Sequence, residues 1–449
     1  MHDLALLGFL LGLILLGLRK PFIFVLGYAY VDIVSPQRLS YYLLNSLQVS
    51  LIFFVLALGG FLAMDDKKGT RLAGRQVLMI LLLLWCGFTT LTADFPAAAA
   101  EKWDWVWKAL LFAIFLPFTL RTRLRIEGLL LFMVVSASSM IVTGGIKTVI
   151  GGGGYGTLNL GLSDNSGLYE GSTISTVAIA IIPTILFLAK YGTVFPRDWK
   201  VRLYSIALVF ACLLIPIGTV TRTGLICIGL VAIMGLRDSK RRLLYIAGMG
   251  VALAVAIPFL PASYTERMHT IQGYQADESA STRVAVWGWT WNYVQSHPAG
   301  GGFNAYLGNH IKIELKDARG QPINNQVEYD KARAFHSAYF EMLGEQGFPG
   351  FFLWAALHFT SLFRLEMLRR RFRKAQGEDE QWIAPLATAL QHGHIIYLVG
   401  SLFIGIAFQP FVYMMIASEI GLDSYVKRTR PLKARPPMGQ TVAMQAVPA

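Results

Sequence analysis

The residues best suited to chemistry are two arginines and a histidine in short motifs late in the chain. Arg222 lies in Thr-Arg-Thr-Gly at the start of an apolar segment, and Arg283 and His336 lie in the hydrophilic stretch 261–346. A guanidinium is a planar fork of donors that can bind two phosphate oxygens at once. An imidazole titrates near neutral pH and can take a proton from an attacking hydroxyl. Together, at one water-facing edge of a membrane, these groups predict a site for an anionic lipid.

Each of these residues also has an ordinary structural explanation, and the sequence leaves both open. Arg222 is typical either of a functional charge or of a boundary arginine whose side chain reaches the lipid headgroups. Arg283 could stack on Trp287 through a cation–π contact, and His336 could cap or pack a helix. The turn His-Pro-Ala-Gly-Gly-Gly-Phe at 297–303 lies between them. The functional interpretation therefore depends on the motifs as an ordered set, since each residue alone is ambiguous.

Other polar motifs are less specific. Asp164 and Asn165 lie in Ser-Asp-Asn-Ser, which enters an apolar segment and could line the mouth of a site. The run Gly151–Gly154 lacks the lysine-serine or lysine-threonine ending of a phosphate-binding loop, so we expect a flexible loop there. The histidines lack metal-ligand spacing, and the sequence predicts no metal and no cofactor. The acidic candidates for a base are Asp164, Glu170, Glu341 and Glu345.

The elements that must position these residues are apolar helices. The chain has 449 residues, of which 54% are hydrophobic, and a mean hydropathy of +0.50. Because lipid cannot satisfy backbone amides, apolar segments of spanning length should be helices. The sequence predicts an all-α polytopic membrane protein with about 12–13 transmembrane helices and one large extracytoplasmic loop. The apolar segments lie at 3–18, 21–35, 41–63, 76–92, 104–120, 127–148, 172–190, 203–219, 222–237, 243–260, 349–367, 385–406 and 408–421.

The net charge of +13 is concentrated in short connectors between these segments. If each segment crosses once, every basic cluster falls on one side, as the positive-inside rule requires. This places the N-terminus outside and the C-terminus in the cytoplasm, and segment 3–18 is expected to be a retained span. Retention of basic loops accounts for the charge, so nucleic acid is not an expected partner. Cys86, Cys212 and Cys227 lie in apolar segments and are expected to be packing residues without disulfides.

Four regions follow from this pattern. Residues 1–260 should hold the first ten transmembrane helices, and residues 261–348 a periplasmic loop with short amphipathic helices. Residues 349–422 should hold the last transmembrane helices, and residues 423–449 a disordered, basic cytoplasmic tail.

Three local features refine the prediction. Loop helices are expected at Ser281–Gln295 and from about Lys331 to Leu343. Pro216, Gly218 and Thr219 predict a break between two spans, which would leave Arg222 at the outer edge of the second. His358, His392 and His394 fall in or beside spans and are expected to form hydrogen bonds between helices.

The ordered motifs resemble those of the O-antigen ligase and polymerase family of bacterial membrane glycosyltransferases. The resemblance covers mainly residues 215–235 and 280–352, and serine commonly precedes the arginine in the family where this chain has Thr221. The N-terminal spans and glycine-rich loop resemble a branch described as exosortase-associated O-glycosylation ligases. The residues that carry the family resemblance are Thr221–Gly224, Arg283 with Trp287, Pro298–Gly302, and His336 followed by Glu345, Gly347 and Gly350.

The resemblance implies transfer of a whole glycan from an undecaprenyl-diphosphate carrier to an acceptor hydroxyl on a lipid, a protein or a polysaccharide. The reaction would be metal-independent and would invert the anomeric centre, in a bacterial inner membrane among its lipids, with the active site facing the periplasm. Arg222 and Arg283 would clamp the diphosphate, and His336 would orient or deprotonate the acceptor. The implied substrate-binding residues are Arg222, Arg283, Trp287, Gly302, Asp164, Asn165 and Glu345.

Alternatives remain open at this stage. A chain polymerase of the same fold would use another lipid-linked unit as its acceptor. A transporter or flippase would place its essential charges at mid-membrane depth. A metal-dependent glycosyltransferase of another fold would need early acidic ligands, for which only Asp32 and Asp94 are placed.

Overall fold

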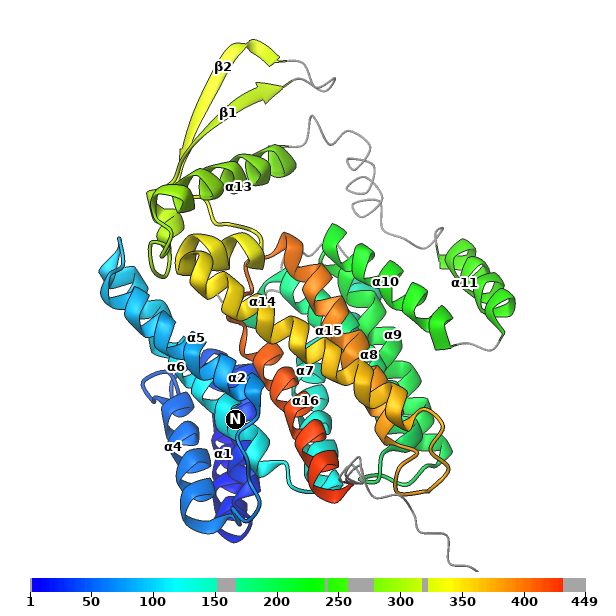
Figure 1. The fold of residues 1–449 in the computed structure, drawn as a ribbon. Helices are drawn as coiled ribbons and strands as arrows, with labels where there is room; N and C mark the ends of the chain where they lie inside the picture. The colour runs from blue at the N-terminus through cyan, green and yellow to red at the C-terminus, as the bar shows by residue number, and fades with distance from the viewer. Residues whose placement is uncertain (1, 152–166, 239–240, 257–277, 317–321, 431–449) are drawn as a thin grey trace, which may run out of the picture.

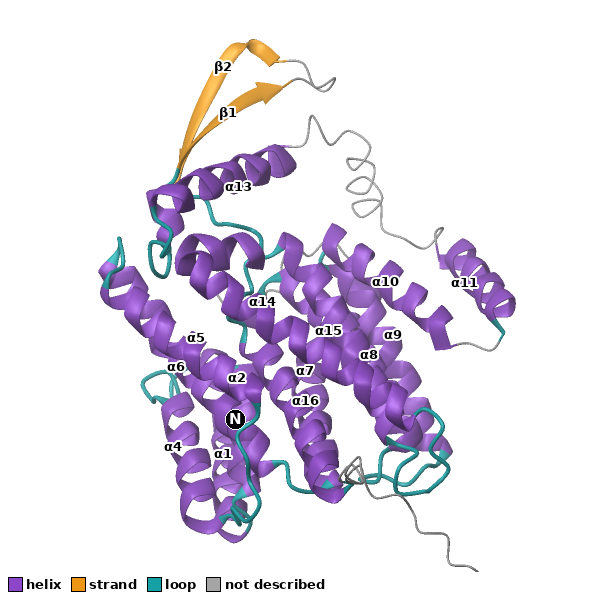
Figure 2. Cartoon of the chain, in the orientation of Figure 1, coloured by secondary structure: helices purple, strands orange, loops and turns teal. Residues whose placement is uncertain are grey.

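The computed structural model describes residues 2–151, 167–238, 241–256, 278–316 and 322–430. They form a helical bundle with a two-stranded hairpin at one end (Figures 1 and 2). Each apolar segment in the sequence contains a helix, which confirms the predicted all-α membrane architecture. The bundle helices are α1 (His2–Arg19), α2 (Phe22–Val34), α3 (Pro36–Leu39), α4 (Val49–Met64), α5 (Gly74–Leu91), α6 (Pro96–Thr119), α7 (Arg123–Gly151), α8 (Gly171–Tyr191), α9 (Trp199–Gly218), α10 (Arg222–Asp238), α11 (Arg242–Ala256), α14 (Ala338–Phe372), α15 (Ile383–Gly400) and α16 (Pro410–Thr429).

Five of the described helices are long and apolar enough to cross a membrane on length and composition alone: α5, α7, α8, α9 and α14. Shorter apolar helices accompany them, including α2 and α4. Many large apolar side chains on these helices face outward, for example Phe88 on α5 and Phe210 on α9, which are 50% and 59% exposed. Outward apolar side chains are stable against lipid, so the chain is a multi-pass membrane protein. Asp164 and Asn165 lie outside the described residues.

The loop before α14 combines a helix with strands. Helix α13 (Glu278–Ser296) confirms the predicted loop helix at Ser281–Gln295. Strands β1 (His310–Lys316) and β2 (Pro322–Lys331) form an antiparallel hairpin with His310 opposite Lys331, and β1 packs on α13. The sequence analysis, which expected only helices in this loop, did not predict the hairpin.

The predicted start of the second loop helix at about Lys331 is wrong, because α14 begins at Ala338. Residue 331 ends β2, and the side chain of Asn309 then binds both the N–H and the C=O of Arg333. Ala332 and His336 have φ of 56° and 48°, which a right-handed helix does not allow. The segment 332–337 is therefore an irregular connector that ends in His336 and Ser337.

The predicted break between α9 and α10 is confirmed. Pro216 lies near the end of α9, and Val220 turns the chain with φ of 53°. The hydroxyl of Ser175 on α8 binds Thr219 at 2.8 Å and Thr221 at 3.0 Å, which fixes the turn against α8. A Cβ at Gly218 would lie 2.0 Å from the hydroxyl oxygen of Thr148, so glycine is required for this close approach. Arg222 consequently stands at the first residue of α10.

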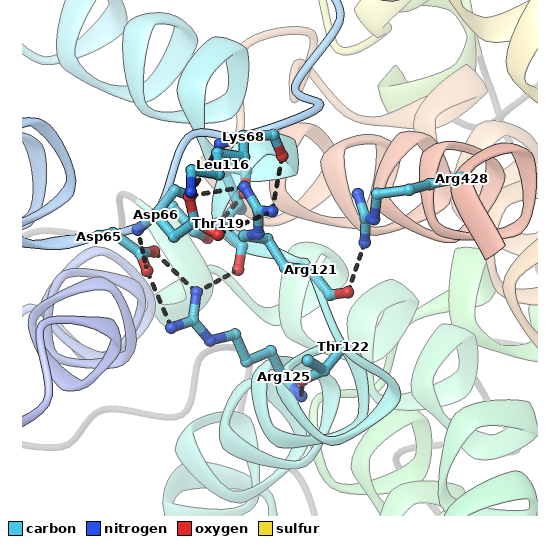
Figure 3. Close-up of polar contacts among 9 residues, drawn as sticks. All are labelled: Asp65, Asp66, Lys68, Leu116, Thr119, Arg121, Thr122, Arg125 and Arg428. Atoms are coloured by element: carbon cyan, nitrogen blue, oxygen red, sulfur yellow. Dashed lines mark hydrogen bonds and ion pairs between the residues drawn. The ribbon is translucent and has the colours of Figure 1, made fainter.

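Basic connectors that are distant in sequence meet at one end of the bundle (Figure 3). Arg121 donates to the carbonyls of Asp66 and Lys68 at 2.6 Å each, and Arg125 donates to both oxygens of Asp65. Arg428, from the end of α16, donates to the carbonyl of Arg121. These contacts bring three of the predicted basic clusters to the same face.

A buried ion pair joins this end to the helices. Asp423 on α16 accepts from Arg75 on α5 at 2.9 Å and from Arg364 on α14 at 2.7 Å. The side chains of Arg75 and Asp423 are only 5% and 3% exposed. This anchor explains why α16 continues through residues 423–429, which the sequence analysis assigned to a disordered tail.

Histidines connect the last three helices inside the bundle. The contacts confirm the predicted hydrogen bonds between helices for His358 and His394. The ring nitrogens of His358 on α14 and His394 on α15 lie 2.6 Å apart, and His394 contacts Glu419 on α16 at 2.9 Å. All three side chains are buried. The polar chain therefore holds α14, α15 and α16 together where water is excluded.

We predict that Asp423→Asn lowers the free energy of unfolding by about 3 kcal/mol, because it leaves the buried Arg75 guanidinium without the carboxylate that it binds. Thermal or SDS unfolding of the purified protein measures this change. Asp66→Asn is the matched control, since Asp66 is 59% exposed in its pair with Arg121 and should contribute less than about 1 kcal/mol. Equal effects of the two substitutions would contradict the importance of the buried pair.

Candidate functional site

A cavity of about 1280 Å³ lies at the end of the bundle opposite to the basic connectors. Helices α6 and α8 show that the two ends are opposite. Their early residues Lys102 and Thr173 line the cavity, whereas their last residues, Thr119 and Tyr191, lie near the basic connectors. Arg222, Arg283, His336 and Glu345 all line this cavity. The structure therefore brings together the three residues that the sequence singled out for chemistry.

Arg222 enters the cavity from the tight turn before α10. The flanking threonines, Thr221 and Thr223, are buried and line the same wall. A Cβ at Gly224 would lie 2.5 Å from Pro216, so this glycine allows the first turn of α10 to pack on the end of α9. The Thr-Arg-Thr-Gly motif thus sets the direction from which the guanidinium reaches the cavity.

Arg283 enters from α13, which packs on α14 and on β1. Val286, Thr290 and Val294 form the buried face of α13 at helical spacing. Trp287, one turn after Arg283, stacks on Phe340 with centroids 5.0 Å apart and donates to the carbonyl of Phe335 at 2.9 Å. Trp287 therefore lies outside the cavity lining and fixes α13 against the connector that carries His336.

His336 lies in the irregular connector before α14, with its flanks Phe335 and Ser337 buried. Its left-handed φ of 48° is uncommon for a residue with a Cβ and persists because the surrounding packing determines it. Desolvation, followed by the positive charge of Arg283, lowers the pKa of His336 from its usual value of 6.5, although Glu170 acts in the opposite direction. The imidazole is thus neutral at neutral pH and can accept a proton.

A buried ion cluster stands behind these groups. The Nζ atom of Lys102 on α6 lies 2.6 Å from Glu341 and 2.8 Å from both oxygens of Glu345. Glu345 also accepts from the backbone N–H of Asn304, and Glu341 accepts from that of Ala407. The cluster ties the first turns of α14 to α6. It thereby fixes the point where the His336 connector enters the helix.

The sequence analysis named Glu341 and Glu345 but missed Lys102. A lysine in a helix that also carries Glu101, Asp104 and Lys108 gives no local signal. Its importance comes from a contact between residues that are more than two hundred positions apart. Only the packing of α6 on the loop could reveal it.

The glycine-rich turn at 297–303 binds the start of α14 through backbone hydrogen bonds. Gly301 donates to the carbonyl of Gly344 at 3.0 Å and Gly302 to that of Glu345 at 2.9 Å, while Phe348 donates to the carbonyl of Pro298. A Cβ on Gly302 would lie 2.7 Å from the carbonyl oxygen of Thr89. The turn therefore holds the kink of α14, and Gly302 lies outside the cavity lining. Contact of Gly302 with substrate stays a prediction.

The kink itself is at Gly347, whose φ of 62° and ψ of −166° lie within α14. A Cβ at this position would lie 2.2 Å from the carbonyl oxygen of Pro298. Glycine is therefore required both by the backbone conformation and by the close approach of the turn. The turn Pro298–Gly302 and the kink at Gly347 therefore pack directly against each other.

The cavity can bind an anion and accept a proton at neighbouring positions. Two guanidinium groups line it together with a neutral imidazole, and its polar walls admit water-soluble groups. Within the described parts of the chain, no three His, Cys, Asp or Glu side chains are arranged to hold a metal ion.

Two family models match the chain. Residues 1–193 match a family of unknown function (DUF5935), and residues 206–355 match the O-Antigen ligase family. No curated protein gives a significant match. The second match begins in α9 and ends in α14, so it contains Arg222, Arg283, His336 and Glu345. The first contains Lys102.

We predict that Lys102→Met destabilises the protein by about 3–5 kcal/mol, since two carboxylates would be left buried without their cation. Adding Glu341→Gln and Glu345→Gln should recover most of this loss, because the uncompensated charge is then removed. Unfolding of the purified variants measures both steps as a thermodynamic cycle. The control is Lys190→Met at the exposed end of α8. If the triple variant does not recover its free energy of unfolding, the charge-pairing explanation is contradicted.

Proposed function

We propose that the protein transfers a glycan from undecaprenyl diphosphate to an acceptor hydroxyl in the described cavity. The match of residues 206–355 to the O-antigen ligase family supports this proposal. The observation that carries this proposal is that Arg222, Arg283 and His336 come from three separate segments and line one cavity. The proposal places the cavity at the periplasmic face of a bacterial inner membrane. The basic connectors lie at the opposite end of α6 and α8 from the cavity, which supports this orientation.

In the proposed reaction, the guanidinium groups of Arg222 and Arg283 hold the oxygens of the diphosphate. The acceptor oxygen attacks the anomeric carbon from the face opposite to the diphosphate, so the configuration inverts. The bond from the anomeric carbon to the phosphate oxygen breaks, and its electron pair stays on the diphosphate. The two arginines stabilise this growing charge. We assign no step to a metal ion or a cofactor.

His336 takes the proton of the acceptor hydroxyl. Its lowered pKa keeps the imidazole neutral before the reaction and able to accept this proton. Glu170, whose charge acts on His336, would stabilise the imidazolium that forms. Glu345 lines the same cavity, but its carboxylate binds Lys102, so we assign it a positioning role.

We predict that His336→Ala reduces glycan transfer at least 100-fold, because the general base is lost. Arg283→Lys should reduce transfer at least tenfold, since the charge remains while the two-pronged hydrogen bonding is lost. Mass analysis of glycoconjugates from cells that carry each variant measures transfer, and immunoblotting of membranes measures the amount of protein. The control is His310→Ala, an exposed histidine of β1.

Wild-type transfer in both active-site variants would overturn the mechanism. The same mass analysis separates a ligase from a polymerase. A ligase yields an acceptor that carries one transferred glycan, whereas a polymerase yields lengthening chains of lipid-linked units.

We also predict the pH dependence of transfer. Protonated imidazole cannot accept a proton, so kcat/KM should fall as the pH decreases through the pKa of His336. Because this pKa is lowered, the midpoint of the fall should lie below 6.5. The measurement is kcat/KM of the purified protein between pH 5 and about 8. The variant His336→Gln should no longer show this fall of kcat/KM at low pH. If the fall persists in the variant, it is due to the titration of another group.

A further inference from the structure

A side pocket of about 230 Å³ opens beside the main cavity, within the region that matches the family of unknown function. It lies between the α2–α4 connector, the first turn of α4 and the middle of α6. Gln37, Ser50, Asp104 and Lys108 line both spaces. The pocket is thus a side extension of the cavity, and it is formed by residues outside the O-antigen ligase match.

Two buried oxygen atoms, one in the main cavity and one where the two spaces join, have no hydrogen-bond partner of good geometry among the described protein groups. They are Oδ2 of Asp32, which lines the main cavity, and Oε1 of Gln37, which lines both spaces. A buried polar atom without a partner costs about 1–3 kcal/mol, so such atoms are rare in folded proteins. Both atoms are hydrogen-bond acceptors, and the donor beside the Asp32 carboxylate is the buried hydroxyl of Tyr28. They fit a ligand that brings several donors.

The charges in the pocket are already neutralised. Lys108 contacts Asp104 at 3.1 Å, and its side chain is only 10% exposed. The charge of Lys108 also acts on Asp32. A phosphate or carboxylate would need a cation that is not committed to a carboxylate, and the pocket offers none among its described lining residues. This distinguishes it from the wall that carries Arg222 and Arg283.

Aromatic rings complete the pocket. Trp107 lines it, and Lys108 lies 6.0 Å from the centre of the Trp107 ring. Trp105 lines the adjoining cavity and is 40% exposed. Indole rings pack against apolar faces, while hydroxyls at the edge of a ligand reach polar neighbours. Acceptor oxygens, a neutral ion pair and indole rings together suit a sugar ring, and the volume lies below the roughly 300–1,000 Å³ of pockets for larger ligands.

We propose that this extension and the adjoining wall of the main cavity form a carbohydrate subsite in which Asp32 and Gln37 accept hydrogen bonds from sugar hydroxyls. The inference rests on the proposed function and assigns a role to the N-terminal region, namely to hold a sugar of one of the two substrates. That sugar belongs either to the glycan of the lipid-linked donor or to a glycosylated acceptor. The chemistry of recognition is the same in both cases.

The test uses the full-length protein in nanodiscs and the variants Gln37→Leu and Asp32→Asn. Binding is measured for undecaprenyl diphosphate without sugar and for the lipid-linked glycan extracted from the source cells. If the sugar is that of the donor, the wild-type protein should bind the glycan-bearing lipid at least tenfold more tightly than the bare lipid. Both variants should lose this difference while they bind the bare lipid normally. Asn45→Leu, in the same connector but outside the pocket lining, is the matched control.

If the sugar is that of the acceptor, both variants should bind the two lipids normally and show at least a tenfold higher KM for the acceptor. The subsite is overturned if the wild-type protein transfers glycan and both variants match it in binding and in KM. Failure of the proposed function gives a different result, in which the wild-type protein neither binds undecaprenyl diphosphate nor transfers glycan. Because Oε1 of Gln37 has no hydrogen-bond partner among the described protein groups, Gln37→Leu should keep the fold.

Discussion

An ionised group costs free energy wherever helices and lipid exclude water, and this constraint arranges the whole molecule. At one end of the bundle, Arg121 and Arg125 bind the carbonyls and carboxylates of a neighbouring connector (Figure 3). Between the helices, Asp423 neutralises Arg75. Beside the cavity, Lys102 forms ion pairs with Glu341 and Glu345. The cavity is the place where arginine, histidine and water-soluble groups can share a space, and it is therefore where polar chemistry can occur.

The Lys102 cluster also makes the two family regions depend on each other. Lys102 belongs to the N-terminal region, whereas Glu341 and Glu345 belong to the O-antigen ligase region. The same glutamates stand at the start of α14, directly after the connector that carries His336. Rotation of α6 relative to α14 would therefore break buried ion pairs and displace the imidazole. The N-terminal region thus contributes to the position of the site as well as to its walls.

Sequence reasoning succeeded where a local pattern determines the structure. Apolar length predicted the helices, and Pro216 with Gly218 predicted the break that places Arg222. It missed the hairpin, although Ile311, Ile313 and Leu315 alternate with charged residues in the period of a strand. It also assigned Trp287 and Gly302 to substrate binding, which stays a prediction. Their contacts with Phe335 and Thr89, far away in sequence, could not be predicted from residue type alone. Lys102 could not be found, because nothing in its own neighbourhood shows what it binds.

The neutral state of His336 matters for the balance of charge in the proposed reaction. A protonated imidazole would attract the diphosphate before the reaction but could not accept the proton of the acceptor. Arg283 opposes that protonation, because its own charge acts on His336. The same guanidinium is then available to the charge that develops on the leaving diphosphate, where fixed donors favour the transition state over the bound substrate. In the same proposal Lys102 would assist indirectly, because it offsets part of the negative charge of Glu341 and Glu345 that would repel the diphosphate. In the proposed reaction Arg283 would thus have two effects that agree: it would keep His336 neutral and stabilise the leaving group.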